Sequence, residues 1–325
     1  MLMSGRAHAE AMISTSDVER AATRIHGRVR RTPAFFDDGV WFKLEHLQHT
    51  GSFKARGAFN RILAAGDIAA AGVVAASGGN AGLAVAYAAR EFGVAARVFV
   101  PATAPAVKVA KLHALGAAVE LVGDKYADAY DAAVKHAADS GALFCHAYDQ
   151  PEICAGQGTI GLELLEQVDG LDTILVAVGG GGLLAGIAAA VEGRARVVGV
   201  EPRTIPTLHS ALDAGEPVQV DVSGPAADSL GASRLGDIAF AVATRTGAGS
   251  ILVEDAAITE ARTTLWDRYR LAVEAGGATA YAALLSGAYV PAPGERVAVL
   301  LCGANTDPAT LTSPSSAPPA ARTPR

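Results

Sequence analysis

The hydrophobic pattern of this chain alternates between two periods from about residue 73 onward. Short apolar and β-branched runs predict strands at 73–76, 97–100, 117–122, 143–146, 173–178, 196–200, 251–254 and 297–301. Ala-rich stretches predict helices between them, near 82–92, 105–115, 126–139, 183–193, 233–246, 255–272 and 276–287. Because helices that connect successive strands make those strands parallel and cover both faces, the pattern predicts parallel α/β sheets.

The two successive series of strands predict two doubly wound parallel-sheet domains, with the binding site in the cleft between them. We assign 54–148 to a small domain, and 16–53 together with 149–308 to a large domain. Ligands of such sheets bind beyond the carboxyl ends of the strands. Residues 1–15 are expected to be flexible, and 309–325, rich in Pro, Ser and Ala, to be disordered.

Charge and composition restrict the classes of partner. The net charge of −6 includes no basic run, so nucleic acid and anionic membrane surfaces are not expected as partners and small-molecule chemistry is favoured. The chain shows neither an apolar run of about eighteen residues nor a signal-peptide pattern at its start, so we expect a cytoplasmic protein. Cys145, Cys154 and Cys302 have no close spacing, which predicts reduced thiols rather than a disulfide or zinc site.

A polar, glycine-bearing segment at 43–60 interrupts the hydrophobic pattern and contains Lys54 at the start of a predicted helix. A lysine that forms a Schiff base must lose its proton readily and needs neighbours that let a planar ring approach. Gly51, Gly57 and Phe53 provide that setting. The alternative is a solvated surface lysine, which is favoured for any lysine taken alone.

The segment Ser77–Gly82, with the sequence SGGNAG, follows a strand and opens a helix. Backbone N–H groups at such a helix start are free to receive an anion, and a substrate carboxylate fits there. The alternative is a plain turn between strand and helix, for which the same residues are also suitable.

Four consecutive glycines, Gly179 to Gly182, also join a predicted strand to a helix. This arrangement favours phosphate binding by closely spaced amides, although a packing turn is an alternative. Gly180, Gly182 and Ala185 additionally match a dinucleotide fingerprint, with Glu201 ending the next strand. A nicotinamide-dependent dehydrogenase is therefore a rival hypothesis, but it leaves Lys54 and the SGGNAG segment without a role.

Five ordered motifs together resemble the serine/threonine dehydratase (threonine ammonia-lyase) and serine racemase family of fold type II pyridoxal phosphate enzymes. TGSFKARGA resembles its lysine motif, SGGNAG its carboxylate loop, GQGTIGLELL its interdomain helix start, VGGGGLLAG its phosphate loop and LLCGAN its ring-nitrogen motif. The resemblance covers about 16–307. It implies a dehydratase that converts L-threonine, L-serine or both to a 2-oxo acid and ammonia by α,β-elimination, and a homodimer.

The resemblance also implies a role for each residue that matches a motif. Lys54 would carry the cofactor as a Schiff base, Phe53 would pack on one face of its ring, and Asn80 would hydrogen-bond its 3-hydroxyl. Cys302 would lie beside the pyridine nitrogen, and Glu274 resembles an acidic residue near the ring or a helix cap. The phosphate would be held by Gly179, Gly180, Gly181 and Gly182, and the substrate by Ser77, Gly78, Gly79, Asn80 and Ala81.

Departures from the family pattern narrow the activity. Gly78 stands where racemases carry a serine hydroxyl, which disfavours the racemase alternative. Ala81 stands where many relatives have His, so another β-hydroxy amino acid remains an alternative substrate. Glu201 is followed by Thr207 rather than an Asp, which suits a monovalent cation such as K⁺, held with the Ile205 carbonyl. A capping role for Glu201 is the alternative.

Overall fold

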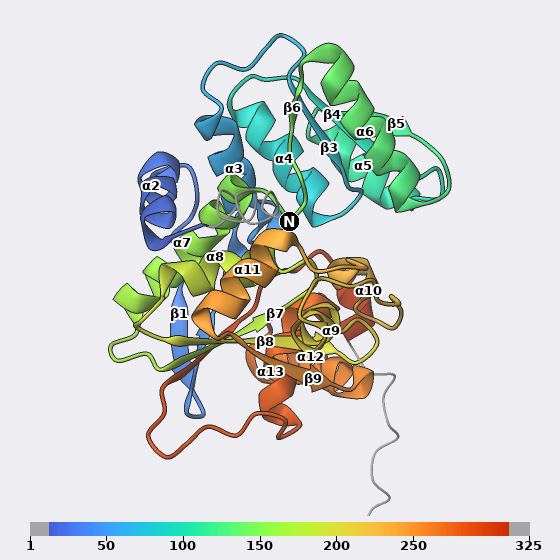
Figure 1. Ribbon diagram of the computed structural model, residues 1–325. Helices are drawn as coiled ribbons and strands as arrows, with labels where there is room; N and C mark the ends of the chain where they lie inside the picture. The colour runs from blue at the N-terminus through green and yellow to red at the C-terminus, as the bar shows by residue number, and fades with distance from the viewer. Residues whose placement is uncertain (1–12, 312–325) are drawn as a thin grey trace, which may run out of the picture.

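The computed structural model describes residues 13–311, in which two sheets form separate layers (Figure 1). Most of the two segments expected to be flexible or disordered, 1–12 and 312–325, lies outside the described residues. Within the described part, Ile13 is buried and η3 (Pro308–Leu311) follows the last strand. The exact domain boundaries stay a prediction.

The smaller sheet contains four parallel strands in the order β5-β4-β3-β6. Its strands are β3 (Val73–Ala76), β4 (Ala96–Val100), β5 (Ala118–Leu121) and β6 (Leu143–Phe144). The helices that connect them are α4 (Asn80–Glu91), α5 (Ala106–Ala114) and α6 (Tyr126–Ser140), in the upper part of Figure 1. These elements agree with the predicted strand and helix series to within a few residues.

The larger sheet contains six strands in the order β1-β2-β10-β7-β8-β9. The strands are β1 (Ala34–Asp37), β2 (Val40–Lys43), β7 (Thr173–Ala177), β8 (Arg196–Pro202), β9 (Gly249–Val253) and β10 (Val297–Leu300). The helices that follow them are α8 (Gly182–Ala190), α9 (Thr207–Ala214), α10 (Ala227–Leu230), α11 (Asp237–Thr246), α12 (Asp255–Tyr269) and α13 (Ala275–Leu285). Strand order 10-7-8-9 is the parallel arrangement that the sequence predicts.

The edge strand β1 departs from the predicted all-parallel sheet, because it pairs antiparallel with β2. Asp38 and Gly39 join the two strands with φ angles of 51° and 79°. Positive φ at both residues is what a two-residue hairpin turn needs, and Asp-Gly is a favoured pair for it. The expectation missed a local turn signal.

Three helices connect the two sheets: α2 (Thr15–Ile25), α3 (Lys54–Ala64) and α7 (Pro151–Gln167). Helix α7 packs against both α3 and α8. Glycines permit this closeness, since a Cβ at Gly156 would lie 2.6 Å from the carbonyl oxygen of Arg56. A Cβ at Gly158 would lie 2.4 Å from the Gly186 oxygen, so α7 holds the start of α3 at a set distance from α8.

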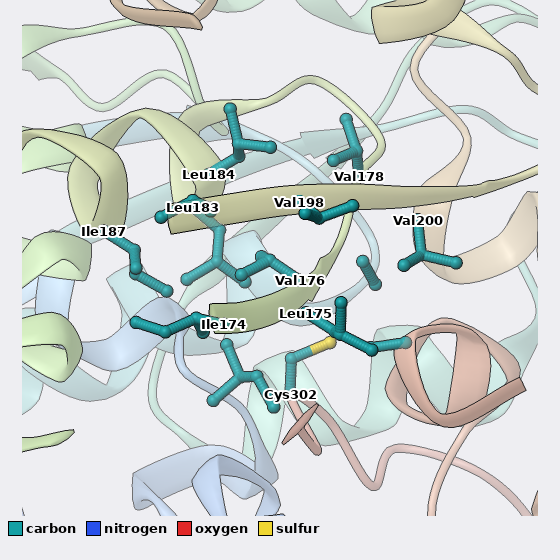
Figure 2. Packing of buried hydrophobic residues seen from close by; sticks show 14 of the residues in the cluster. Ile174, Leu175, Val176, Val178, Leu183, Leu184, Ile187, Val198, Val200 and Cys302 are labelled. Carbon is teal, nitrogen blue, oxygen red and sulfur yellow. The ribbon is translucent and has the colours of Figure 1, made fainter. Parts of the chain in front are cut away.

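The centre of the large sheet is apolar on both faces. Ile174, Leu175 and Val176 of β7 are fully buried, and Figure 2 shows them beside α8 and β8, with Cys302 next to Leu175. A parallel strand covered on both faces reads as an unbroken hydrophobic run rather than an alternating one. The loops after β7 and β10 therefore emerge from a rigid, close-packed core.

A buried ionic network fixes the start of α3. The Arg56 guanidinium donates to Glu45 Oε1, in η1 (Glu45–Leu47), at 2.7 Å and to Glu163 Oε1 of α7 at 2.7 Å. Lys43 of β2 adds a second cation, 2.6 Å from Glu163 Oε2. The two positive and two negative charges offset one another, and they tie β2, α3 and α7 together two residues beyond Lys54.

Candidate active site

A cavity of about 480 Å³ opens at the carboxyl ends of strands from both sheets. Its wall includes every residue that the sequence assigns to cofactor or substrate binding. These residues are Phe53, Lys54, Ser77, Gly78, Gly79, Asn80, Ala81, Gly179, Gly180, Gly181, Gly182 and Cys302. Segments more than 200 residues apart in the chain thus meet in one place.

Lys54 is the first residue of α3, and its amine points into this cavity wall. Its Nζ donates to the carbonyl oxygen of Ala147 at 2.5 Å and lies 5.0 Å from the centre of the Phe53 ring. Burial disfavours the ammonium form and lowers the pKa of Lys54 to about 8, although the nearby Glu274 carboxylate and two cysteines oppose the shift. The amine is therefore more easily deprotonated than an exposed lysine.

The lysine motif is attached to the ring-nitrogen motif by backbone contacts. The Phe53 amide donates to the Cys302 carbonyl oxygen at 3.1 Å, and Ser52 forms a β-bridge with Gly303. The Cys302 thiol lies 3.4 Å from the Gly276 carbonyl oxygen, to which it can donate. Burial raises the pKa of the Cys302 thiol, so this side chain stays neutral at ordinary pH.

The glycine loop presents unpaired amides to the cavity. The N–H groups of Gly180, Gly181, Gly182 and Leu183 meet no protein acceptor within 13–311, as expected at the start of α8. Side chains are excluded behind the loop, because a Cβ at Gly180 would lie 2.3 Å from the Tyr148 ring. Gly181 has a φ of 83°, which favours glycine in addition. The loop combines free donors with a helix N-terminus, the arrangement that binds phosphate.

The SGGNAG segment forms the facing wall, at the start of α4. The Ser77 hydroxyl accepts from the Gly79 amide at 3.2 Å, while the Gly78 and Ala81 amides have no acceptor in the described part of the chain. Asn80 Nδ2 donates to Glu274 Oε1 at 2.6 Å. Glu274 makes no side-chain capping bond at α13, and burial raises its pKa to about 7.

The residues predicted to hold a cation lie behind the glycine loop and do not line the cavity. Glu201 is buried at the end of β8 and accepts from the amides of Leu208 at 2.7 Å and His209 at 2.9 Å. These bonds cap α9, which agrees with the alternative role. Thr207 Oγ1 lies 3.0 Å from Glu201 Oε1 and 2.5 Å from the Gly179 oxygen. Burial, offset in part by these bonds, raises the pKa of Glu201 to about 7.

Sequence reasoning did not find several residues that line or support the cavity. Tyr148 packs against the glycine loop, and Lys108 of α5 forms an ion pair with Asp228 of α10 across the cavity. Asn305 donates to Asn80 Oδ1 at 2.7 Å. The chain carries no local signal for these pairs, because their members are 120 and 225 residues apart.

Fold and site together define a two-domain α/β enzyme, with a reactive lysine and an anion-binding glycine loop in the cleft. The description "Pyridoxal-phosphate dependent enzyme" belongs to the family model that matches 27–303 of this chain. The chain is a member of this family of pyridoxal-phosphate dependent enzymes. The nicotinamide hypothesis is set aside, since the family match accounts for the glycine loop that suggested it.

Named relatives agree with this membership. An L-threonine ammonia-lyase of Geobacter sulfurreducens is 38% identical over 318 residues, 92% of this chain and 77% of that protein. A phenylserine dehydratase of Ralstonia pickettii is 38% identical over 300 residues, 89% of this chain and 92% of that protein. These relatives and the family match make the chain a pyridoxal-phosphate-dependent lyase of the dehydratase type.

Solved structures show the same two-domain fold. Maize serine racemase superposes with a TM-score of 0.87 and 32% identity, covering 93% of this chain and 96% of that one. A bacterial-type threonine deaminase, that of T.th., superposes with a TM-score of 0.84 and 36% identity, covering 91% of this chain and 99% of that one. Among the described residues, no helix is both long and apolar enough to cross a membrane.

The cavity residues fit pyridoxal phosphate. The unpaired amides of Gly180 to Leu183 supply donors for a phosphate dianion, and the lowered pKa of Lys54 suits a covalent bond to an aldehyde. Cys302 supplies a neutral group for the ring nitrogen. The fit concerns the chemistry of the donors and requires no rearrangement of the loop.

Proposed function

We propose that this enzyme eliminates water from L-threonine, L-serine or both, and releases a 2-oxo acid and ammonia. The observation that carries the proposal is the buried Lys54 amine, with its pKa lowered to about 8, in a cavity between an anion loop and a glycine loop. Relatives that are named L-threonine ammonia-lyase and threonine dehydratase support the substrate class.

The proposed binding roles follow from the donors in the wall. Lys54 holds the cofactor covalently, the amides after Gly179 hold its phosphate, and Asn80 and Cys302 meet the 3-oxygen and the ring nitrogen. Pyridoxal phosphate supplies an electron sink for the negative charge that develops at the substrate α-carbon. A neutral thiol beside the ring nitrogen makes this sink weaker than a carboxylate would, which elimination tolerates.

The substrate carboxylate is proposed to bind at the start of α4. The free amides of Gly78 and Ala81 and the positive end of the helix favour a negative charge there. This contact fixes the amino acid with its α-carbon toward the side of the cavity that holds Lys54. Orientation of this kind removes much of the entropic cost of the reaction.

Proton transfer is assigned to Lys54. Once its amine is free, a lowered pKa lets a large fraction act as a base near neutral pH, where an ordinary lysine stays charged. Gly78 places no hydroxyl on the facing loop, so a proton taken from one face of the α-carbon is not returned from the other. That difference favours elimination over racemisation.

Three measurements test the proposal. The purified protein should be yellow, with an absorbance band that Lys54→Ala abolishes, and should release 2-oxo acid from L-serine or L-threonine. The same variant should lose at least about a thousandfold in kcat, because general-base and covalent catalysis are lost together. A colourless wild-type protein that binds NADH, or failure on both amino acids and on a β-aryl serine, contradicts the proposal.

A second candidate substrate is a bulkier β-hydroxy amino acid. Ala81 and Gly78 leave the cavity wall without large side chains beside the proposed carboxylate loop, and the Ralstonia relative is named for phenylserine. Comparing kcat/KM for L-threonine and a β-aryl serine decides between them. A preference of tenfold or more for the aryl substrate would favour this second candidate.

A monovalent cation near Glu201 is a further part of the proposal. Glu201 Oε1, Thr207 Oγ1 and the Gly179 oxygen lie close together, and the hydroxyl has one proton to share between two acceptors. A K⁺ ion or a protonated Glu201 would relieve the excess of acceptors. Exchange of potassium for sodium and then magnesium tests this: recovery of cofactor affinity and activity by magnesium alone contradicts it.

Quaternary structure and location complete the proposal. We infer a homodimer from the family resemblance, and a cytoplasmic location from the three free, buried cysteines, which a reducing compartment preserves. Sedimentation at several concentrations checks the first inference. Fractionation of the host cell checks the second.

A further inference from the structure

Three polar side chains form a continuous hydrogen-bonded chain along one wall of the cavity. Asn305, three residues after Cys302, donates from Nδ2 to Asn80 Oδ1 at 2.7 Å. Asn80 in turn donates from Nδ2 to Glu274 Oε1 at 2.6 Å. Asn305 Nδ2 also donates to the carbonyl oxygen of Thr50 at 2.8 Å, four residues before Lys54.

The Thr50 carbonyl sets the direction of the whole chain. A side-chain amide can turn by 180° with little change of shape, so its orientation depends on its partners. A backbone carbonyl only accepts, and it therefore requires the NH₂ end of Asn305 to face it. The same NH₂ group then faces Asn80, whose oxygen must turn toward Asn305.

This constraint decides which atoms Asn80 presents elsewhere. With Oδ1 committed to Asn305, Nδ2 is left to face Glu274, which accepts one of its two hydrogens. The second hydrogen meets no acceptor among the described residues, and Asn80 lines the cavity. A donor is thereby held toward the cavity, where the reversed amide would present an oxygen.

Glycines make room for this chain. A Cβ at Gly303 would lie 1.9 Å from Glu274 Oε1, which no side chain tolerates. Gly51 has a φ of 74°, and a Cβ there would be 3.4 Å from Asn305 Oδ1. Backbone segments from both the lysine motif and the ring-nitrogen motif thus enclose the chain of amides.

We propose that Asn305 is a positioning residue for the cofactor, which acts through Asn80 by keeping its N–H, rather than its oxygen, directed at the cofactor 3-oxygen. The proposal rests on the proposed function, in which Asn80 meets that oxygen. Glu274 anchors the same amide from the other side. Asn305 itself touches neither cofactor nor substrate in this account.

The decisive variant is Asn305→Asp, which keeps the shape and removes the donor. A carboxylate facing the Thr50 carbonyl and Asn80 Oδ1 is repelled by both, and Asn80 relieves its share by turning its NH₂ group toward position 305. Its oxygen then faces the cofactor. Asn60→Asp is the matched control, because Asn60 also donates to a backbone carbonyl, that of Glu152 at 2.6 Å, but does not line the cavity.

The readout is binding of pyridoxal phosphate to the apoprotein, followed by absorbance. Asn305→Asp should weaken binding about tenfold, which corresponds to one hydrogen bond replaced by a repulsion, and should shift the absorbance maximum. An analogue without the 3-hydroxyl should bind the wild type and Asn305→Asp equally. Asn60→Asp should bind pyridoxal phosphate within about twofold of the wild type.

A double variant shows whether Asn305 acts through Asn80. If it does, Asn305→Asp combined with Asn80→Ala binds no more weakly than Asn80→Ala alone. Additive losses, or an Asn305→Asp protein with unchanged affinity and absorbance, overturn the proposal. If the apoprotein of Asn305→Asp does not fold, Asn305→Ala replaces it, with the same expectation for the double variant.

These outcomes are separate from failure of the proposed function. A wild-type protein that forms no absorbance band, or that releases no 2-oxo acid, contradicts the dehydratase assignment before any variant is compared. A normal, active wild type with an unaffected Asn305→Asp contradicts the positioning role alone.

Discussion

The amine of Lys54 donates a hydrogen bond of 2.5 Å to the carbonyl oxygen of Ala147, although the two residues are 93 positions apart. The contact joins the start of α3 to the segment between β6 and α7, at the junction of the two sheets. One hydrogen bond to a neutral carbonyl does not compensate for burial, so the pKa of Lys54 falls to about 8.

The lowered pKa of Lys54 predicts how the apoprotein takes up its cofactor. Only the neutral amine attacks an aldehyde, so the rate of incorporation should rise about tenfold per pH unit below pH 8 and level off above it. Stopped-flow absorbance after addition of pyridoxal phosphate measures this rate, with free N-acetyl-lysine as the reference. A rate that keeps rising to pH 10 would show that Lys54 has an ordinary pKa.

Thr207 is predicted to support the glycine loop from behind. Thr207→Val removes the hydroxyl that lies 2.5 Å from the Gly179 oxygen and leaves two acceptors unpaired. We expect pyridoxal phosphate to bind about 5- to 30-fold more weakly, since the loss of one buried hydrogen bond costs about 1–2 kcal/mol. Thr246→Val, which removes a hydroxyl bonded within its own helix to the Val242 oxygen, serves as the control and should bind normally.

The ion pair between Lys108 and Asp228 is predicted to influence substrate binding modestly. Their side chains are 29% and 66% exposed, so solvent screens the pair and limits its value to about 0.2–1 kcal/mol. Asp228→Asn should raise the KM for the amino acid by about two- to fivefold with little change in kcat, and less at high salt. Exchanging the charges, with Lys108→Asp and Asp228→Lys together, should recover part of the loss. No recovery would point to a role for each side chain by itself.

The buried network around Arg56 is predicted to matter for stability. Arg56→Met leaves the carboxylates of Glu45 and Glu163 without their main partner, and breaking a buried ion pair in this way costs about 3–5 kcal/mol. Urea unfolding of the apoprotein measures the loss. Arg31→Met removes an exposed partner of Glu166 and should cost no more than about 0.5 kcal/mol. Equal losses in the two variants would contradict the assigned importance of burial.

Local sequence was sufficient for most of the secondary structure. The strand at Val73–Ala76 begins and ends where the apolar run predicts, and the helix predicted at 126–139 is α6, Tyr126–Ser140. Buried parallel strands and their helices differ in period, which neighbouring residues alone reveal. The antiparallel strand β1 was missed, although its Asp38-Gly39 turn is itself a local signal.

Motif residues were also found from sequence, because each motif is a short segment whose backbone serves one ligand group. Gly180 to Gly182 illustrate this: free amides at the start of α8 follow from a strand, a glycine run and a helix in succession. The assignment of pyridoxal phosphate needed the resemblance in addition, since a dinucleotide loop has a similar pattern.

The chain by itself thus determined the α/β class, the glycine loop and the candidate lysine. Only the tertiary structure decided that Asn305 orients Asn80, that Lys108 meets Asp228, and that the amine of Lys54 is buried against Ala147. The physical reason is range. Backbone period and turn chemistry act between near neighbours, whereas desolvation and the choice of hydrogen-bond partner depend on segments brought together from opposite ends of the chain.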